Sequence, residues 1–427
     1  MMDGPIKIWP APGISKKAAD ERYVKRTDMV YGARYDAVND AWQKGILIGV
    51  LFVESDFNVF PIHEKMIRGL LTPAGEFNPL DSEDSTKLPD GSAATVDGST
   101  GQTMVRIPAH HKLNIKDGNF RYSFVSESPF EFLGHDAYIP PIFGSDDCIY
   151  VGAYKGVAAT DAVGAELISA IKDTSGYTSN PYPNPFTNRT RGQFRTQHQE
   201  GFFPHCWSIY EIVFNLFVTE YASWDTQATI PGYTGASAYS YSYVRPAGRT
   251  AGLGNASGSI LADLAGVDSD LSGIVAVDEY VANSYRGIED FFGNVWEFLD
   301  GININNTDGS CHVFVCHDPD LFADDTADGY IDTEHAPGFG DLDGYTTDLA
   351  FLSQDCAFYP SNITGGSSAT FMRDYHYNSA GGWRVLLCSG HLSNGAQAGF
   401  GFLYANNASS NAHSAISARS AAKKKAA

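Results

Sequence analysis

The chain lacks any stretch approaching 18 consecutive apolar residues, the minimum expected of a membrane-spanning helix. The longest apolar run near the start, Gly45–Val53, is short and follows a charged segment. This run predicts a buried strand. It is not interpreted as the apolar part of a signal peptide, because the first 28 residues lack the basic, apolar and small-residue order of such a peptide. We therefore expect synthesis in the cytoplasm and no insertion into a membrane.

Positive charge is also scarce. Lys and Arg total 29 against 50 Asp and Glu, which gives a net charge of −21, and the sequence pI is about 4.8. Proteins that bind nucleic acid present basic surfaces, so this composition argues against a nucleic-acid partner.

Paired cysteines are missing as well. None of the six cysteines forms a CxxC pair, so the spacing indicates no zinc site. Cys311 and Cys316 each precede a histidine, which leaves a metal site open as an alternative. The alternation of side chains over 312–317 favours a single strand with two faces.

What is present fits a large globular protein rich in β structure. The 427 residues suffice for two or three domains, and 13% of them are aromatic. We predict an α+β chain in which a β-rich N-terminal region precedes a second folded domain. The expected divisions are an N-terminal attachment arm (1–30), a β-rich connecting domain (31–155), a second domain (156–420) and an exposed tail (421–427).

Local patterns predict individual elements within this plan. Ile46–Val53 and Thr103–Ile107 are typical of strands, and the polar stretch Asn78–Gly101 is typical of a loop. Apolar side chains with helical spacing predict helices over Thr160–Ile171 and Ser208–Tyr221.

Residues 318–348 contain ten acids and no Lys or Arg. A calcium-binding loop would use such carboxylates, but the ligand order of an EF-hand is missing. A solvated acidic loop is the simpler interpretation.

The most specific segment is Gly293-Asn-Val-Trp-Glu297. Gly293 and Asn294 suit a turn, and the large rings that follow suit a buried strand. This block resembles a segment shared by formylglycine-generating enzymes and by the variable proteins of diversity-generating retroelements, both of which have a C-type-lectin-like fold. A second block, Gly381-Gly-Trp-Arg-Val385, is similar to a core strand of that fold. The resemblance implies a C-type-lectin-like domain over 156–420, with a fold core that includes Gly293, Asn294, Trp296, Glu297, Gly382, Trp383 and Arg384.

The surrounding segments resemble phage tail proteins of this kind more than enzymes. They are Asp97–Val105, Leu216–Tyr221, Trp224–Gln227 and Arg286–Glu289. Formylglycine-generating enzymes oxidise with copper held by cysteines, and this chain has only Cys388 after the second block. A Gly-x-Ser-x-Gly nucleophile motif is absent as well. We therefore expect no enzymatic activity and no cofactor; the resemblance implies no obligatory calcium.

Residues 389–420 differ from the rest of the chain. Ser, Ala, Asn and Gly supply 22 of these 32 residues, and Arg419 is the only charged one. Small residues with interspersed aromatics, amides and imidazoles are typical of adaptable binding surfaces. An ordinary core segment and a flexible linker remain open as alternatives.

The same window fits adenine-directed diversification. Replacing the first two bases of an Asn codon can give Asn, His, Tyr, Phe or Ser but never Lys, Glu, Gln, Met or Trp. Of that excluded set, the window contains only Gln397. The candidate receptor-binding positions are His391, Ser393, Asn394, Phe402, Tyr404, Asn406, Asn407, Asn411, His413 and Ser414.

Together these features predict a phage tail or fibre receptor-binding protein, an adhesin of the virion that recognises a protein or glycan receptor on the host cell through residues 389–420. Expected partners are that receptor, other virion proteins and further copies of the chain, with a trimer expected from fibre architecture. A structural or decoration protein of the virion without a receptor is the alternative.

Overall fold

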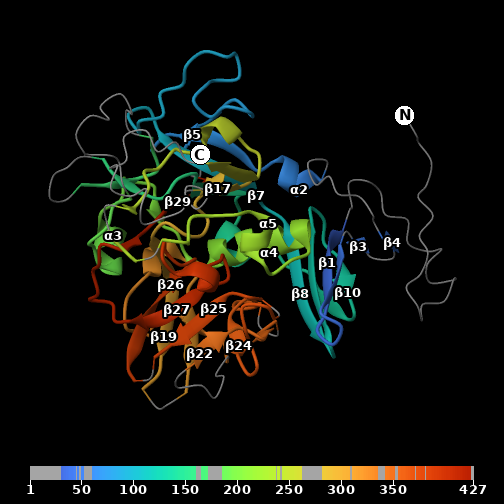
Figure 1. Ribbon diagram of the computed structural model, residues 1–427. Coiled ribbons are helices and arrows are strands. Elements are labelled where there is room, and N and C mark those ends of the chain that lie inside the picture. The colour runs from blue at the N-terminus through green and yellow to red at the C-terminus, as the bar shows by residue number, and fades with distance from the viewer. Residues whose placement is uncertain are drawn as a thin grey trace, which may run out of the picture.

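The computed structural model describes residues 30–424 except 45, 48–49, 52–59, 160–164, 172–184, 237, 241–242, 262–280, 308–309, 335–341, 352–353, 371 and 380. The predicted N-terminal arm, residues 1–30, lies outside this range apart from Val30. Among the described residues strands far outnumber helices, which agrees with a β-rich chain (Figure 1).

Three larger sheets organise the molecule. A four-stranded sheet has the order β2 (Ala41–Lys44), β1 (Tyr31–Asp36), β9 (Phe120–Ser126) and β8 (His111–Asp117). A six-stranded sheet has the order β15 (Phe203–Pro204), β29 (Ser420–Lys423), β12 (Cys148–Gly152), β7 (Gln102–Pro108), β5 (Ile67–Leu71) and β6 (Phe77–Pro79). The predicted strand Thr103–Ile107 is thereby confirmed as part of β7.

The third sheet has eight strands. Seven follow the order β21 (Ile331–Asp332), β20 (His312–Val315), β19 (Trp296–Asn305), β26 (Trp383–Cys388), β27 (Leu403–Asn407), β25 (Tyr375–Asn378) and β22 (Leu342–Tyr345). The eighth, β28 (Ile416–Ser417), pairs in parallel with β19. Strands β25 and β27 are also parallel, and the other pairs are antiparallel.

Smaller elements connect these sheets. The short strands are β3 (Ile46–Leu47), β4 (Val50–Leu51), β10 (Glu131–Phe132), β11 (His135–Asp136), β13 (Val157–Ala158), β14 (Leu167–Ile168), β16 (Gly258–Leu261), β17 (Val281–Tyr285), β18 (Ile288–Glu289), β23 (Asp348–Leu349) and β24 (Pro360–Asn362). The helices are α2 (Pro61–Glu64), α3 (Arg191–Thr196), α4 (Trp207–Tyr221) and α5 (Thr226–Thr229), with 3-10 turns η3 (Pro141–Phe143), η6 (Ala251–Leu253), η9 (Pro319–Leu321) and η10 (Gly395–Gln397). The predicted strand Ile46–Val53 is a hairpin of β3 and β4 within the described residues.

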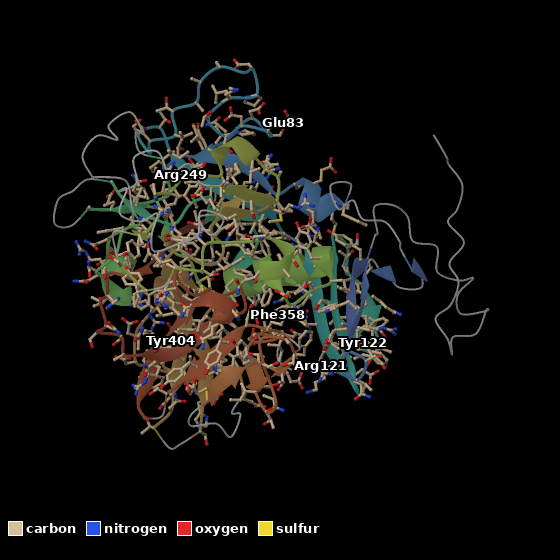
Figure 2. The ribbon with its side chains drawn as sticks, in the orientation of Figure 1. Glu83, Arg121, Tyr122, Arg249, Phe358 and Tyr404 are labelled. Atoms are coloured by element: carbon tan, nitrogen blue, oxygen red, sulfur yellow. The ribbon has the colours of Figure 1, made fainter. Side chains whose placement is uncertain are left out.

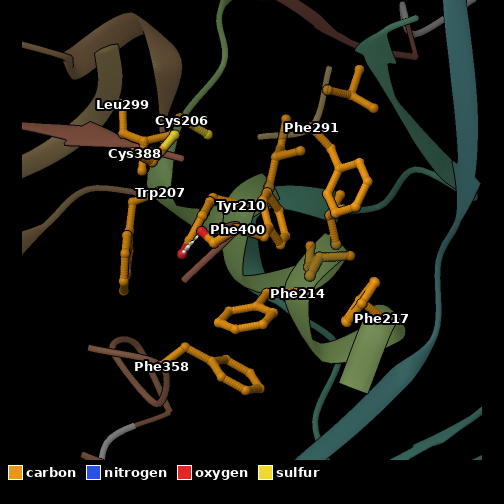
Figure 3. Close-up of a cluster of buried hydrophobic side chains, with 14 of the residues drawn as sticks. Cys206, Trp207, Tyr210, Phe214, Phe217, Phe291, Leu299, Phe358, Cys388 and Phe400 are labelled. Atoms are coloured by element: carbon orange, nitrogen blue, oxygen red, sulfur yellow. Dashed lines mark hydrogen bonds between the residues drawn. The ribbon is translucent and has the colours of Figure 1, made fainter. Parts of the chain in front are cut away.

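Helix α4 lies at the centre of the molecule, between the four-stranded and eight-stranded sheets (Figure 1). It confirms the helix predicted over Ser208–Tyr221. Its residues are buried all around except Tyr221, as expected of a helix covered on several sides. Aromatic side chains of α4 pack on loops of the C-terminal half, and Tyr210 donates a 2.7 Å hydrogen bond to the carbonyl of Phe400 (Figure 3).

The helix predicted over Thr160–Ile171 is wrong for the described residues 165–171. Leu167 and Ile168 form β14, which pairs with β13. The backbone N–H of Leu167 donates to the carbonyl of Gln197, and that of Ser169 donates to the side chain of Gln102. The N–H of Ile171 donates to the carbonyl of Val96. Because these donors bond to distant segments, the helical spacing of the apolar side chains does not produce a helix.

The prediction of an exposed tail over residues 421–427 is wrong for the first residues of that segment. Ser420–Lys423 forms β29 between β12 and β15, and Ala421 and Ala422 are buried. The six-stranded sheet therefore contains strands from both sides of the division predicted at residue 155.

The Gly293–Glu297 block has a structural role. Gly293 has a φ of 82°, and a Cβ there would lie 2.5 Å from the carbonyl oxygen of Tyr233. The Asn294 side chain bonds to the backbone N–H and carbonyl of Arg245 and also donates to Asp290. This turn delivers Trp296 and Glu297 into the start of β19, both buried.

Glu297 is the shared acceptor of two buried cations and lies beside the imidazole of His205. Arg419 Nη2 and Lys155 Nζ lie 2.6 and 2.9 Å from Glu297 Oε1, and His205 Nδ1 lies 3.4 Å from Oε2. Burial raises the pKa of this carboxyl, but the charges of Arg419 and Lys155 outweigh burial and hold the pKa well below its usual range. The Glu297 carboxylate is thus bound by side chains of three other segments.

The fully buried imidazole of His63 predicts sensitivity to acid. Its Nε2 lies 3.1 Å from the carbonyl of Leu216 and its Nδ1 2.9 Å from the Tyr31 hydroxyl, and burial lowers its pKa from 6.5 to about 4. The unfolded chain then binds the extra proton between these values, so stability falls as pH drops from about 6.5 to about 4. Between pH 6.5 and 4, the free energy of unfolding is expected to fall by about 3 kcal/mol less in His63→Gln than in the unaltered protein. Urea unfolding midpoints across that range measure the difference. An unchanged slope would contradict a neutral buried His63.

Candidate functional site

The face of the eight-stranded sheet turned away from α4 carries a group of tyrosines; we call it the outer face. Tyr377 of β25 is opposite Tyr404 of β27, and β22 adds Asp343 opposite Tyr377 and Tyr345 opposite Tyr375. Residues paired in this way lie on the same side of a sheet. Their neighbours His376, Asn378, Leu403 and Ala405 are buried on the α4 side.

The rings on the outer face contact one another in two pairs. Tyr377 and Tyr404 stack with centroids 5.0 Å apart at an interplanar angle of 23°. Tyr345 and Tyr375 meet edge to face at 5.1 Å. All four tyrosines are half-buried, so each ring retains some accessible surface, and Tyr404 is visible on this sheet in Figure 2.

Trp296 and Tyr239 connect this face to the loops of the 389–420 window. Trp296 lies 5.4 Å from the ring of Tyr404 and 5.8 Å from that of His391. The ring of Tyr239 lies 5.2 Å from His391 and 6.0 Å from His413, and its hydroxyl donates to the carbonyl of Ser414. The two predicted histidines, 22 positions apart in sequence, therefore share one aromatic neighbour.

Most of the remaining predicted positions join the same region through polar contacts. Asn394 Oδ1 accepts from the backbone N–H of His391, and the N–H of Ser393 donates to the His391 ring. Asn406 Nδ2 lies 3.1 Å from the Tyr404 hydroxyl, and Asn411 Nδ2 donates to Asn407 Oδ1 at 2.7 Å. In the described structure His413 is exposed, and His391, Ser393, Asn394, Tyr404, Asn406, Asn407, Asn411 and Ser414 are half-buried.

Phe402 is the predicted receptor-binding position that the structure contradicts. Its side chain is 2% exposed and packs on Trp296 at 4.6 Å. The strand β27 begins only at Leu403, so Phe400 and Phe402 do not continue its alternation. Phe402 belongs to a second hydrophobic core on the same side of the sheet as Tyr404, with Phe194, Phe298, Val385 and Leu387.

The fold-core assignment needs a correction in the second block. Gly382, Trp383 and Arg384 are half-buried at the start of β26, whereas the burial expected of core residues begins at Val385. Trp383 packs on Phe314 of β20 at 5.7 Å, at the other end of the sheet from β22. In the first block Asn294, Trp296 and Glu297 are buried as predicted.

Small residues in the window are required by packing at two positions. A Cβ added to Gly399 would lie 1.9 Å from Asp374 Oδ1, and one added to Gly401 would lie 2.7 Å from the sulfur of Met372. Asp374 is buried and accepts from the N–H of Gly401 at 2.8 Å. Burial raises the pKa of this carboxyl well above its usual range. The window is therefore neither a linker nor uniformly permissive.

Gly399→Ala is expected to destabilise the protein by several kcal/mol, because the added methyl group collides with the buried carboxyl of Asp374. Thermal and urea unfolding would measure the loss. Gly252→Ala is the matched control, since a Cβ there meets nothing within 4 Å. Equal stability of the two variants would contradict the close approach of Gly399 to Asp374.

The surroundings of His391 and Tyr375 keep both side chains uncharged near pH 7. Burial lowers the pKa of His391 from 6.5 to about 4, so the imidazole is uncharged near pH 7. Burial, together with the hydrogen bond to Asp343, raises the pKa of Tyr375 to about 12. The Tyr375 hydroxyl therefore keeps its proton and donates it to Asp343 Oδ1 at 2.6 Å.

Sequence reasoning missed the contribution of Tyr345, Tyr375 and Tyr377, which lie before the window. A signal was available, since Asp374-Tyr-His-Tyr-Asn378 places tyrosines at a spacing of two, as on a strand. The parallel pairing of β25 with β27, which brings these rings beside Tyr404, was not readable from the sequence.

One group of residues has the order of a hydrolase triad. Ser208 Oγ lies 2.8 Å from His317 Nδ1, and His317 Nε2 lies 2.8 Å from Asp355 Oδ1. The serine is 5% exposed in the first turn of α4, and Trp207 Nε1 donates to the carbonyl of Asp355 at 2.7 Å. A cavity of about 380 Å³ nearby is lined by Asp318 and Pro319 but by neither Ser208 nor His317. These contacts anchor α4, and we derive no catalytic step from them.

The acidic segment 318–348 forms ion pairs in the described part. Asp324 pairs with Arg191 and Arg195, and Asp348 pairs with Lys116 and Arg121. Asp341 lies outside the described residues. Among residues that the structure describes, no group of three or more His, Cys, Asp or Glu could hold a metal ion. His312 to Val315 forms β20 with alternating burial, which confirms the two-faced strand.

No protein-family model matches this sequence, and a search of the curated proteins returns no match. Within the described residues, no helix is both long enough and apolar enough to cross a membrane.

Proposed function

We propose that the chain is a phage tail or fibre receptor-binding protein whose outer face and adjoining loops bind a host cell-surface receptor. The observation that carries the proposal is the gathering of nine of the ten predicted positions around Trp296, Tyr239 and β27. Residues as far apart in sequence as His391 and His413 thus join one partly exposed region. Tyrosine, asparagine, serine and histidine together supply ring surface and adaptable hydrogen bonds, the mixture found in paratopes.

The proposal includes a C-type-lectin-like domain diversified by a retroelement. Rigid packing around the face supports it, because Phe402, Leu403 and Ala405 are buried while their neighbours Tyr404 and Asn406 are partly exposed. A fixed scaffold of this kind lets surface residues change without loss of the fold. In this proposal the protein is a component of the virion, made in the host cytoplasm, and several copies, as in a trimeric fibre, raise weak binding through avidity.

A test uses purified, fluorescently labelled full-length protein and cells of the strain that the phage infects. Saturable binding to these cells is expected, together with reduced adsorption of the phage when the protein is added in excess. Mutant cells that no longer adsorb the phage should not bind the protein. If the protein assembles into particles but binds no susceptible cells, a structural or decoration protein without a receptor is the better description.

A further inference from the structure

The outer face extends beyond the 389–420 window, and its added part has a distinct chemistry. Asp343, Tyr345, Tyr375 and Tyr377 all precede the window, yet they lie beside Tyr404 on adjoining strands. Adenine-directed change in the window would leave these four residues unaltered. The face therefore has a fixed half, consisting of these four residues, and a variable half, consisting of Tyr404, Asn406 and the window loops.

We propose that the outer face binds a neutral glycan of the host surface, with Tyr377 of the fixed half and Tyr404 of the variable half as the aromatic platform. This inference rests on the proposed function and names the ligand class of the same face.

The ring geometry supports a sugar as the ligand. The aligned C–H groups on one side of a pyranose carry partial positive charge and pack against the negative face of an aromatic ring. Tyr377 and Tyr404 differ by only 23° in plane and have centroids 5.0 Å apart, so the two rings stack on each other and offer a sugar the outward ring surface of the pair. Both rings are half-buried, which holds them in place while part of each remains accessible.

Polar groups beside the rings match sugar hydroxyls. Asp343 is exposed, and its Oδ1 is oriented by the Tyr375 hydroxyl at 2.6 Å, so the carboxylate can accept from ligand hydroxyls through its other lone pairs. Asn406 Nδ2 lies 3.1 Å from the Tyr404 hydroxyl, which fixes an amide next to the platform. Because these contacts already hold the Asp343 carboxylate and the Asn406 amide, both groups lose little conformational freedom when a ligand binds, which favours affinity.

The charge of the face selects against acidic sugars. Asp343 is the only charged side chain among the residues that define the two halves of the sheet face, and the chain carries a net charge of −21. A polyanionic glycan would be repelled by Asp343 and also by the net negative charge of the whole protein. A neutral glycan meets none, and its hydroxyls pair with the acceptors described above.

The experiment compares binding of the labelled full-length protein to susceptible cells after two treatments. Periodate, which cleaves vicinal diols of sugars, is expected to abolish binding, and protease treatment of the cells is expected to leave it intact. Binding to immobilised neutral surface polysaccharide from the same cells is expected to weaken about tenfold or more in Tyr377→Ala and to persist in Tyr377→Phe, which keeps the ring. Val38→Ala, which trims an exposed apolar side chain of the four-stranded sheet, is the matched control and should bind as the unaltered protein does.

The outcomes separate this inference from the proposed function. Binding that survives periodate and is lost after protease would overturn the glycan while leaving a receptor-binding protein in place. Equal binding by Tyr377→Ala and the unaltered protein, with thermal stability also equal, would overturn the platform. If untreated susceptible cells do not bind the protein at all, the proposed function fails and the glycan inference fails with it.

Discussion

Replacing Glu297 with glutamine is expected to destabilise the protein by about 3–5 kcal/mol, although the change removes no more than a charge. The side chain is 3% exposed, and Lys155 and Arg419 are each 1% exposed. Without the carboxylate, two buried cations lose their shared counter-charge in a region where water cannot replace it. The free energy of unfolding from urea titration measures this loss.

The position of Glu297 explains why the effect should extend through the whole chain. Arg419 also donates to the carbonyl oxygens of Gly152 and Glu289, so the Glu297 carboxylate orients a guanidinium that links β12, β18 and the approach to β29. Glu83→Gln is the matched control, because Glu83 is exposed (Figure 2) and its loss should change stability by less than about 0.5 kcal/mol. A Glu297→Gln variant as stable as the control would show that the cluster is not ionised as described.

Phage particles carrying Tyr404→Ser together with Asn406→Ala are expected to lose adsorption by about a hundredfold or more while particle yield stays unchanged. Truncating one central aromatic contact costs an interface about 2 kcal/mol or more, and several copies on one fibre multiply the loss. Tyr404 is central because it contacts both Trp296 and Tyr377. Adsorption rates and particle counts from the same lysates measure the two quantities separately.

The control for this pair is Ser410→Ala, which changes an exposed residue of the same window. Tyr404→Phe retains the ring and should adsorb better than Tyr404→Ser. Normal adsorption of the double variant, or a parallel loss of particle yield, would contradict a receptor-binding role for this face and favour a structural one.

Sequence reasoning predicted elements well where local pattern and burial agree. The apolar run of α4 and the strands β7 and β20 follow directly from spacing and composition. The segment 165–171 shows the limit, because its backbone donors bond to Val96, Gln102 and Gln197 and no local pattern encodes those partners. The final residues show the same limit, since two alanines look exposed until β12 and β15 enclose them.

The candidate site was predicted in part for a similar reason. Composition pointed to 389–420, but an amino-acid list does not separate Tyr404, which is partly exposed, from Phe402, which supports Trp296 from beneath. Composition likewise does not show that Gly399, one of the small residues of this window, is constrained by Asp374. The tyrosines of β25 became part of the site only through parallel pairing with β27.

The measurement that tests the central claim most directly is deep sequencing of the 3′ end of the gene in a growing phage population. The account predicts adenine-derived substitutions concentrated in the codons of partly exposed residues: 391, 393, 394, 404, 406, 407, 411, 413 and 414. Codons 399, 401, 402, 403 and 405, whose residues are packed, should stay unchanged in phage that still adsorb. A window as invariant as the rest of the gene, or substitutions spread equally over packed and exposed codons, would contradict a diversified receptor-binding face.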